Sequence, residues 1–570
     1  MNYILKLVNT DATTGYFEVV PEDDIDFDTA VEILHKRPLD DFLHRYVLHF
    51  LTEFNDEQVS ALIRKAVNDG DLILQSIGCE RILLSGRLSR AKKFFSEKTI
   101  KKLKKISPLI NIRSALGNNT RLNAKWISLF KENIIFHKEL PSLHDSGISP
   151  VCAGDCSVKK QLGLTIKDLY QNYAGSTGEK FPEGQTIKTA LKRLENAGIV
   201  LKKEMRHESS LSPFALLRQW EFNIRIENMR NIFSLSGRQT SYGKGLTLEQ
   251  SRASLTMEIV ERCSAFASIS SCGVEGFVRK YPMFYGSYTK VLSEGKKAVN
   301  PDEIALEIRY DNEPVHWIEG TTAVRCPDRN ISEKALVPVQ AVFLFSNLDE
   351  IDLFSGLGST GLASGNTMEQ AKVAALLEII ERHQEAVVPF ETSRCFRLVV
   401  EDREKNNTLA RLLESYYSLG IDLLFQDITP EYGVPCCKCF VTGIDGKIYK
   451  GTAAGLNAKK AIISAITETN YPFPKGPVSA KGPDDLIVVG FENLPDYSGS
   501  DYASDLALLE QVLISNGLRP YYVDLTRRDI GLPVVKAIIP GMEIMGDFDA
   551  FSRVHPELFQ NYLKSDINAK

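Results

Sequence analysis

Hydrophobic residues in the first part of the chain recur at three- and four-residue spacing, a pattern that predicts helices. Over 28–110, segments such as DDFLHRYVLHFL and DEQVSALIRKAV place Leu, Ile and Val on one helical face. The basic runs RAKKFF and KTIKKLKKI are typical of the solvated faces of helices. We therefore predict a mostly helical N-terminal region over residues 1–145.

A different pattern follows over residues 146–230. LTIKDLYQNY predicts an amphipathic helix, and QTIKTALKRLENAG predicts a second helix that ends at Gly198. The charged segment IVLKKEMRHES then predicts a short strand and a basic turn. This order is typical of a winged helix. Its Lys188–Lys203 face could contact DNA, its wing could bind a peptide, or the unit could be purely structural.

From about residue 235 onward, apolar runs typical of strands alternate with long helical patterns. The strand-like runs are ALVPVQAVFLF, DLLFQDI and PVVKAIIPG. PFPKGPVSAKGP and the final NYLKSDINAK are interpreted as loops or tails. The sequence predicts an α/β (α+β) domain over residues 231–570.

Length, charge and cysteine content restrict the possible classes of protein. A chain of 570 residues predicts two to four domains, and its net charge of −5 makes nucleic acid an unlikely partner. No secretory signal and no apolar run of about 18–20 residues is present, so we expect a cytoplasmic protein without a membrane span. The ten cysteines do not suggest a disulfide framework. Two cysteine clusters are possible but disfavoured zinc sites. A metal at Cys152 and Cys156 would need further ligands, and Cys436, Cys437 and Cys439 are interpreted as small apolar side chains of a buried strand.

An internal repeat is the most informative feature of the sequence. Residues 247–262 read TLEQSRASLTMEIVER, and residues 367–382 read TMEQAKVAALLEIIER. A weaker third copy, GLNAKKAIISAITE, ends at Glu468. Each copy has a glycine thirteen residues before its first glutamate of this set, at Gly245, Gly365 and Gly455. The repeat predicts three units, each a glycine turn followed by a helix.

The repeated helices carry paired carboxylates. Glu258 and Glu261 are three residues apart and share a helical face, as do Glu378 and Glu381. Carboxylates brought together repel one another unless cations neutralise them, and Mg²⁺ shared with nucleotide phosphates does so with oxygen ligands. The glycine turns would offer N–H groups to anions, and Lys244 in SYGKGLT adds a positive charge. The repeat therefore predicts a polyphosphate site bridged by Mg²⁺.

The repeat also has structural interpretations that need no ligand. E-x-x-E-R segments also occur on wet helix surfaces, and a duplication can be retained for structural reasons alone. The sequence has no G-x-x-x-x-G-K-[ST] loop, kinase signature set, H-E-x-x-H motif or G-x-S-x-G elbow.

These segments resemble a known family, the YcaO domain. SYGKGLTLEQSRASLTMEIVER and GLASGNTMEQAKVAALLEIIER resemble its first two signature segments, and VDLTRRDIGLPVVKAIIPGME resembles its closing segment. The resemblance covers about residues 235–560. It implies a YcaO-type domain of glycine-turn/helix units packed on mixed sheets, and ATP- and Mg²⁺-dependent activation of a peptide backbone amide, as in the biosynthesis of modified peptides. The nucleophile would be a side chain, giving an azoline, external sulfide, giving a thioamide, or an amine, giving an amidine.

The resemblance also implies roles for individual residues. The Mg²⁺ ligands would be Glu258, Glu261, Glu378 and Glu381. The nucleotide contacts would be Lys244, Ser254 and Asn366. Arg262 and Arg382 would orient the carboxylates or contact phosphate, and Glu468 resembles the glutamate of the third family segment.

Several positions depart from the family pattern. Gln370 stands where the family usually has a glutamate, and Ser464 where it has an arginine. Both are counted among the ATP-binding positions. The Gln370 amide can still hydrogen-bond a ribose or an adenine edge, but it cannot neutralise a cation. NYPFP replaces the usual Gln-x-Arg, and Thr360-Gly361 replaces a frequent Asn-Gly. The chain ends in SDINAK without a proline-rich terminus, which favours thioamidation or a divergent amide modification over azoline formation.

Three hypotheses follow. The first is the amide-activating enzyme, with a peptide or protein substrate, a TfuA-like or ubiquitin-activating-like partner, and a homodimeric state. The second is a degenerate YcaO scaffold that binds a peptide through the winged helix without catalysis. The third is a regulator that binds DNA through residues 160–205.

Overall fold

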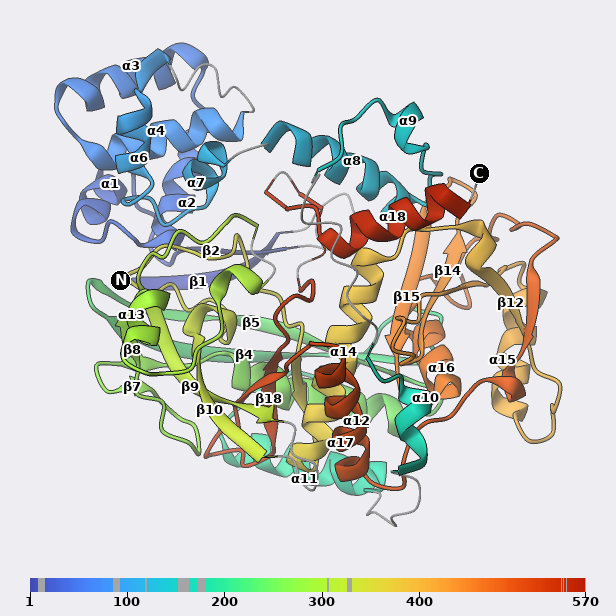
Figure 1. Ribbon diagram of the computed structural model, residues 1–570. Coiled ribbons are helices and arrows are strands. Elements are labelled where there is room, and N and C mark those ends of the chain that lie inside the picture. The colour runs from blue at the N-terminus through green and yellow to red at the C-terminus, as the bar shows by residue number, and fades with distance from the viewer. Residues whose placement is uncertain are drawn as a thin grey trace.

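The computed structural model describes the chain except residues 9–15, 86–92, 118–119, 152–162, 173–180, 305–306, 325–330, 545, 547, 550 and 569–570. In the described residues the strands form three sheets, with helices between and around them (Figure 1). The α/β fold class with mixed sheets, expected from the sequence, is confirmed. No helix of the described part is long and apolar enough to cross a membrane.

The first sheet joins the start of the chain to the strands around the first repeat. Its order is β2-β1-β5-β4-β6-β7, with β3 on β4. Strand β1 runs parallel to β5, while β4 and β5 form a long antiparallel hairpin. The strands are β1 (Asn2–Val8), β2 (Tyr16–Pro21), β3 (Met205–Arg206), β4 (Phe214–Asn228), β5 (Asn231–Gly245), β6 (Ile269–Ser270) and β7 (Gly273–Val274).

The second sheet is antiparallel and has the order β10-β9-β17-β18-β11, with β8 on β9. Its strands are β8 (Phe284–Gly286), β9 (Val315–Val324), β10 (Ile331–Pro338), β11 (Leu362–Ser364), β17 (Tyr521–Asp524) and β18 (Val534–Ile538). The third sheet has the order β15-β14-β13-β12-β16, and its edge strand β16 is parallel to β12. Its strands are β12 (Cys395–Val399), β13 (Leu424–Asp427), β14 (Cys436–Thr442), β15 (Ile448–Ala454) and β16 (Ile487–Gly490).

The three repeated helices each pack on the strand that precedes them. They are α12 (Leu248–Ala265) on β5, α14 (Met368–Val387) on β11 and α16 (Ala458–Glu468) on β15. Each also contacts the strand of the next copy, since α12 meets β11, α14 meets β15 and α16 meets β5. The three copies therefore close into a ring of alternating helices and strands.

The other helices between Ile166 and Asn568 lie outside the three repeated units. Gly451, on β15, shows how closely helix and strand approach, because a Cβ there would lie 2.4 Å from the carbonyl oxygen of Ala465 on α16. The helices are α10 (Ile166–Leu169), α11 (Glu183–Asn196), α13 (Tyr288–Ser293), α15 (Asn407–Ser418), α17 (Tyr502–Ser515) and α18 (Pro556–Asn568).

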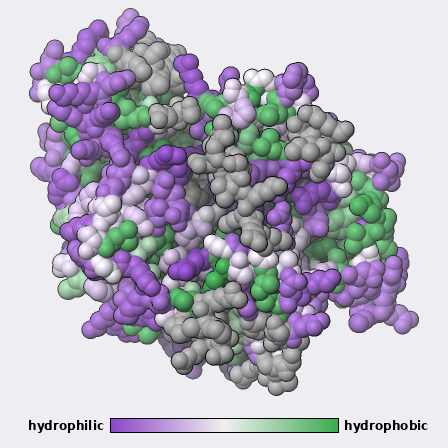
Figure 2. All heavy atoms as spheres, in the orientation of Figure 1, coloured by the Kyte–Doolittle hydropathy of each residue, from purple (hydrophilic) through white to green (hydrophobic). Residues whose placement is uncertain are grey.

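The N-terminal helices form a group of their own, blue at the upper left of Figure 1. Two apolar clusters hold them together, and the face seen in Figure 2 is mainly hydrophilic there. The helices are α1 (Phe27–Lys36), α2 (Asp41–Phe50), α3 (Asp56–Asn68), α4 (Leu72–Leu84), α6 (Glu97–Leu103) and α7 (Asn111–Leu116). Helices α8 (Thr120–Phe136) and α9 (Leu143–Ser146) lie apart from this group, and α8 packs against α18. The expected helical character of residues 28–110 is confirmed, but β1 and β2 also tie this region into the first sheet.

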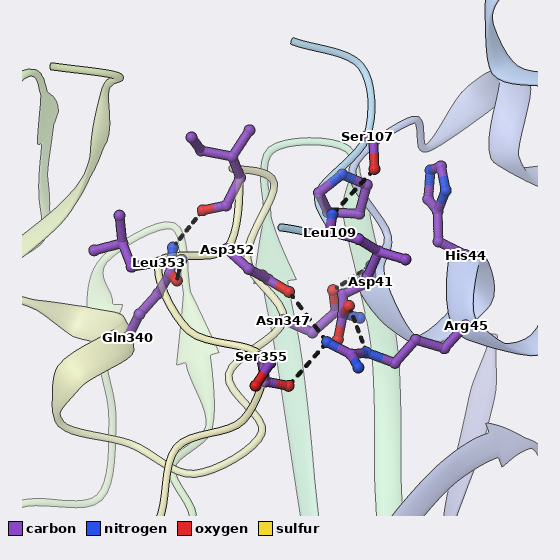
Figure 3. A network of polar contacts seen from close by, with 12 residues as sticks. Asp41, His44, Arg45, Ser107, Leu109, Gln340, Asn347, Asp352, Leu353 and Ser355 are labelled. Carbon is purple, nitrogen blue, oxygen red and sulfur yellow. Dashed lines mark hydrogen bonds and ion pairs between the residues drawn. The ribbon is translucent and has the colours of Figure 1, made fainter. Parts of the chain in front are cut away.

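A polar network docks the N-terminal helices on the segment that precedes β11 (Figure 3). Asp41 accepts a hydrogen bond from Arg45 at 2.8 Å, and its backbone N–H donates to Asn347 Oδ1 at 2.9 Å. Arg45 also donates to the carbonyl oxygen of Ser355 at 3.0 Å and lies 3.8 Å from the Asp352 carboxylate. The loop that these contacts hold continues directly into the turn before the second repeat.

Some sequence expectations need correction. ALVPVQAVFLF is a strand only as far as Pro338 and then turns into a 3₁₀ helix. NYLKSDINAK is no tail, because its described residues belong to α18, which packs Phe559 and Tyr562 against Trp126 of α8.

A separate winged helix is not confirmed. Helix α11 packs on α12, β3 pairs with β4, and the β4–β5 hairpin turns at the expected boundary near 230. The domain boundaries expected from the sequence remain predictions.

The cysteine clusters fall partly outside the described residues, where Cys152 and Cys156 lie. Cys437 and Cys439 face one apolar cluster and Cys436 another, as expected for a buried strand. In the described ranges, no three His, Cys, Asp or Glu residues are placed to hold a metal ion, so a zinc site at Cys436–Cys439 is not supported.

Candidate functional site

Helix α12 presents the glutamates of the first repeat. Its N-cap is Thr247, whose side chain accepts the N–H of Gln250 at 3.2 Å. Leu255, Ile259 and Val260 are buried in the main core. Ser254, Glu258 and Glu261 therefore lie on the strip of the helix that the core leaves uncovered, and Ser254 is exposed there.

Helix α14 repeats this construction. Thr367 caps it by accepting the N–H of Gln370, and Leu376, Ile379 and Ile380 are buried. Glu378 and Glu381 lie on the partly exposed strip. The match between α12 and α14 in caps, core residues and carboxylates explains why the two sequences are so similar.

The first glutamate of each pair is anchored to a backbone N–H group. The N–H of Tyr242 donates to Glu258 Oε2 at 3.0 Å, and the N–H of Gly361 donates to Glu378 Oε2 at 3.2 Å. Both donors precede the helix on its own strand or turn. Each anchor orients one carboxylate oxygen and leaves the rest of the group to other partners.

The third copy joins the same region through an ion pair. Lys244 Nζ donates to Glu468 Oε2 at 2.8 Å, to the Glu468 carbonyl oxygen at 3.3 Å and to Asn470 Oδ1 at 3.3 Å. Lys244 is on β5 and Glu468 ends α16, so this contact joins the first copy to the third. Ser464 is exposed one turn before Glu468 on the same helix.

The charges of the three copies act on one another. Burial raises the pKa of Glu258, and the Glu468 carboxylate raises it further. Burial likewise raises the pKa of Glu261, with a contribution from Glu378. The pKa of Glu381 rises to about 8 because of burial, then because of Glu378 and other nearby carboxylates, against the effect of Arg382. Five glutamates from three separate segments therefore face a common region.

Two arginines lie among these carboxylates. Arg262 Nε is 3.6 Å from both Glu258 Oε1 and Glu261 Oε1, and Arg382 Nε is 3.7 Å from Glu381 Oε1. Lys244 pairs with Glu468, and the two guanidinium groups compensate only part of the negative charge that the four remaining carboxylates carry when ionised. Such a site favours divalent cations with oxygen ligands.

The family comparison agrees with this site. The family model described as YcaO cyclodehydratase, ATP- and Mg²⁺-binding, matches residues 242–543, which is more than half of the chain. The chain belongs to the YcaO family. The match begins at Tyr242, the donor to Glu258, and contains all five glutamates, and it confirms ATP and Mg²⁺ as the ligands expected from the sequence.

Three matched proteins share less than a third of their residues with this chain. An uncharacterised protein of Methanothermobacter thermautotrophicus is 28% identical over 360 residues, which covers 57% of this chain and 85% of that protein. Among solved structures, a heterocyclase in complex with substrate and cofactor has a TM-score of 0.48 at 20% identity and covers 66% of this chain. The match spans 56% of that heterocyclase. YcaO from Methanopyrus kandleri, bound with AMPPCP and Mg²⁺, has a TM-score of 0.44 at 19% identity, with 64% of this chain and 93% of that chain covered.

The residues present fit Mg²⁺ held together with a nucleotide. Carboxylate oxygens are the hard ligands that Mg²⁺ prefers, and it is usually bound by one or two carboxylates plus phosphates. No three acidic, histidine or cysteine side chains of the described part are placed to hold a metal by themselves.

Several expected nucleotide contacts are engaged within the protein. Gln370 Oε1 accepts the N–H of Asn366 at 2.8 Å, as Gln250 does for Leu246 in the first copy, and Gln370 Nε2 lies 3.2 Å from the Tyr502 hydroxyl. Gln370 therefore completes a helix cap, and Asn366 Oδ1 accepts from Thr186 at 3.2 Å.

The three glycine N–H groups are also engaged, which corrects the expectation that they are open to an anion. They donate to Ser212 Oγ and to the carbonyl oxygens of Pro533 and Pro435, each at 3.0 Å.

Sequence reasoning missed two charged residues of the region. Lys536 on β18 is buried, and its pKa falls to about 8 because burial outweighs the attraction of Glu378. Glu385, one turn after Glu381, lies 2.8 Å from Lys450 Nζ and 3.6 Å from Arg382 Nη1. For Lys536 the available signal was a lone charge in the apolar segment PVVKAIIPG, whereas Glu385 follows the charged residues Glu381 and Arg382 and has no such signal.

Proposed function

We propose that this chain transfers the γ-phosphoryl group of ATP to the oxygen of a backbone amide in a peptide or protein substrate. The observation that carries the proposal is the convergence of Glu258, Glu261, Glu378 and Glu381 with Glu468 around two arginines. Carboxylates are conserved between the two well-matched copies of the repeat at the positions that face this region.

Each group has a role in the proposal. The four paired glutamates hold Mg²⁺, which when bound neutralises the charge that develops on the transferring phosphoryl group. Arg262 and Arg382 orient these carboxylates. Lys244, Ser254 and Asn366 contact the nucleotide, and the anchors from Tyr242 and Gly361 fix Glu258 and Glu378 in place.

The proposed reaction has two stages, phosphorylation of the amide oxygen and loss of phosphate. A nucleophile bearing a proton adds to the amide carbon, the amide oxygen takes the phosphoryl group, and ADP leaves. Phosphate then departs with that oxygen. Hydrosulfide gives up its one proton, a side-chain nucleophile and the amide nitrogen give up one proton each, and an amine gives up two. These protons pass to phosphate and solvent. Sulfide as nucleophile gives a thioamide, a side chain of the peptide gives an azoline, and an amine gives an amidine. We propose thioamidation or a related amide modification, with a TfuA-like or ubiquitin-activating-like partner and a homodimeric enzyme.

The test is phosphate release from ATP in the presence of candidate peptides, followed by mass spectrometry of the peptide. Glu378→Gln should lower peptide-stimulated release about 100-fold, an effect typical of removing one preorganised electrostatic group. Glu369→Gln is the matched control, because Glu369 is an exposed carboxylate on the same helix. Loss of water from the peptide indicates a ring, and exchange of oxygen for sulfur indicates a thioamide.

A second candidate is a degenerate scaffold that binds peptide without catalysis. It is favoured by the engagement of Lys244 with Glu468 and Asn470, and by the use of Gln370 in a helix cap. Calorimetric titration with Mg²⁺ and ATP separates the two, because the enzyme binds the nucleotide and the scaffold releases no heat.

A further inference from the structure

Lys536 is a buried cation on strand β18, near Glu378 and Glu261 of the candidate metal site. It lies in the middle of β18, between Val535 and Ala537, and is 3% exposed. Its Nζ donates to the carbonyl oxygen of Thr360 at 2.7 Å. A buried ammonium is costly unless a specific contact compensates it, so its presence in an apolar strand needs a reason.

The carbonyl that Lys536 binds belongs to the same peptide group that binds Glu378. The C=O of Thr360 accepts from Lys536, and the N–H of Gly361, on the other side of that peptide bond, donates to Glu378 Oε2 at 3.2 Å. Hydrogen bonds in series polarise one another, so a cation on the carbonyl strengthens the N–H as a donor to the carboxylate. Lys536, the peptide and Glu378 therefore form one aligned chain of hydrogen bonds.

Gly361 keeps this peptide group in one orientation. Its φ is +79°, a conformation that favours glycine, and a Cβ there would lie 2.4 Å from the carbonyl oxygen of Ala537. The carbonyl oxygen of Gly361 accepts from the N–H of Ala537 at 2.7 Å. Two adjacent residues of strand β18 therefore hold the turn. Lys536 binds the carbonyl oxygen of Thr360, and Ala537 binds that of Gly361.

We propose that Lys536 is a positioning residue for the Mg²⁺ site, acting on Glu378 through the Thr360–Gly361 peptide. The inference rests on the proposed function, since it assigns to Lys536 the task of keeping a metal-binding carboxylate oriented. The charge of Lys536 also offsets the mutual repulsion of Glu378 and Glu261, both of which act on it. Partners behind metal ligands commonly change metal affinity by 10- to 100-fold when they are removed.

The experiment is calorimetric titration of Mg²⁺ into protein saturated with a non-hydrolysable ATP analogue. Lys536→Met should weaken Mg²⁺ binding about 10- to 100-fold. Lys536→Arg, which keeps the charge and a donor, should restore most of it. A purely structural role would lower the fraction of competent protein without changing the dissociation constant. Lys438→Met is the matched control, because Lys438 is also fully buried but its ammonium faces Gln426 Oε1 at 3.3 Å, and it should leave Mg²⁺ affinity unchanged.

The pathway through Glu378 is tested by a double-mutant cycle. In a Glu378→Gln background, Lys536→Met should cause no further loss of Mg²⁺ affinity. Unchanged affinity in the single Lys536→Met variant, or the same loss in both backgrounds, overturns the assignment while leaving the proposed function intact. Wild-type protein that binds no Mg²⁺ with the analogue overturns the proposed function and this assignment together. If Lys536→Met does not fold, Lys536→Gln, which keeps a donor without the charge, takes its place with the same expected loss.

Discussion

Glu381 and Glu385 lie one turn apart on α14 and are both 17% exposed, yet replacing them with glutamine should have opposite effects on stability. Burial and neighbouring carboxylates raise the pKa of Glu381 to about 8. Burial also acts to raise the pKa of Glu385, but Lys450 and Arg382 outweigh it and lower that pKa to about 2. Glu381→Gln removes an unfavourable charge, whereas Glu385→Gln removes a favourable one.

The direction in which stability changes with pH follows from how many protons the folded and the unfolded protein bind. Between pH 4.5 and about 8 the folded protein holds a proton on Glu381 that the unfolded chain has lost, so the free energy of unfolding falls as pH rises through this window. At about 1.4 kcal/mol per pH unit, the full loss is about 5 kcal/mol, and residual contact with water reduces it. For Glu385 the favourable contribution is about 3 kcal/mol at neutral pH and is lost as pH falls from 4.5 toward 2.

The assay is denaturant unfolding of the metal-free protein between pH 5 and 8.5. Glu381→Gln should be more stable than wild type at pH 8, with a difference that shrinks toward pH 5, whereas Glu385→Gln should be less stable throughout. Mg²⁺ with ATP should stabilise wild type increasingly as pH rises, because the ligand binds the ionised carboxylates. A Glu381→Gln variant that is less stable at pH 8, or whose stability changes with pH as in wild type, would refute the reasoning.

Three further predictions concern other parts of the molecule. His137 stacks on Phe390 with ring centroids 3.9 Å apart, and burial, with Lys438 and Lys450, lowers its pKa to about 2, so the free energy of unfolding falls as pH falls below 6.5. His137→Phe should remove this loss, which is about 2–3 kcal/mol between pH 6.5 and 4.5 in denaturant unfolding, and parallel pH curves for variant and wild type would contradict this. Trp126 is fully buried against Phe559 and Tyr562, so Trp126→Ala should lower the free energy of unfolding by about 3–5 kcal/mol and make α18 accessible to limited proteolysis. Unchanged cleavage would show that α18 docks by other contacts. Val488 is 61% exposed on edge strand β16, so Val488→Lys should reduce light scattering on heating. Val278→Lys, at a 56% exposed position outside the strands, should not.

The repeat made most of the candidate site predictable. Identical residues at matched offsets showed that Glu258 and Glu378 occupy equivalent places on two helices, and mutual repulsion gave a physical reason for a cation between them. The repeat predicted a glycine turn followed by a helix, but not the caps at Thr247 and Thr367, and Gln370 was assigned to the nucleotide although it closes a cap. A glutamine side chain offers the same atoms for either use, and only the surrounding backbone decides between them.

What the sequence could not supply were contacts between distant segments. Lys536 approaches Glu378 only because β18 pairs with β11, a pairing that no local periodicity encodes. Strand β1 likewise joins β5 in parallel from the far end of the chain, and α18 forms against Trp126 rather than through a strong pattern of its own. The winged-helix interpretation relied on the order of elements, whereas the described β3 is an extension of the sheet behind α12.

The closed ring of three copies also determines when the protein can first complete its fold during synthesis. Because α12 contacts β11, α14 contacts β15 and α16 contacts β5, the surfaces of the first copy stay uncovered until the third has left the ribosome. Lys536 is translated later still. A prematurely terminated chain would therefore present apolar helix and strand faces to chaperones and proteases, and no nucleotide could rescue it.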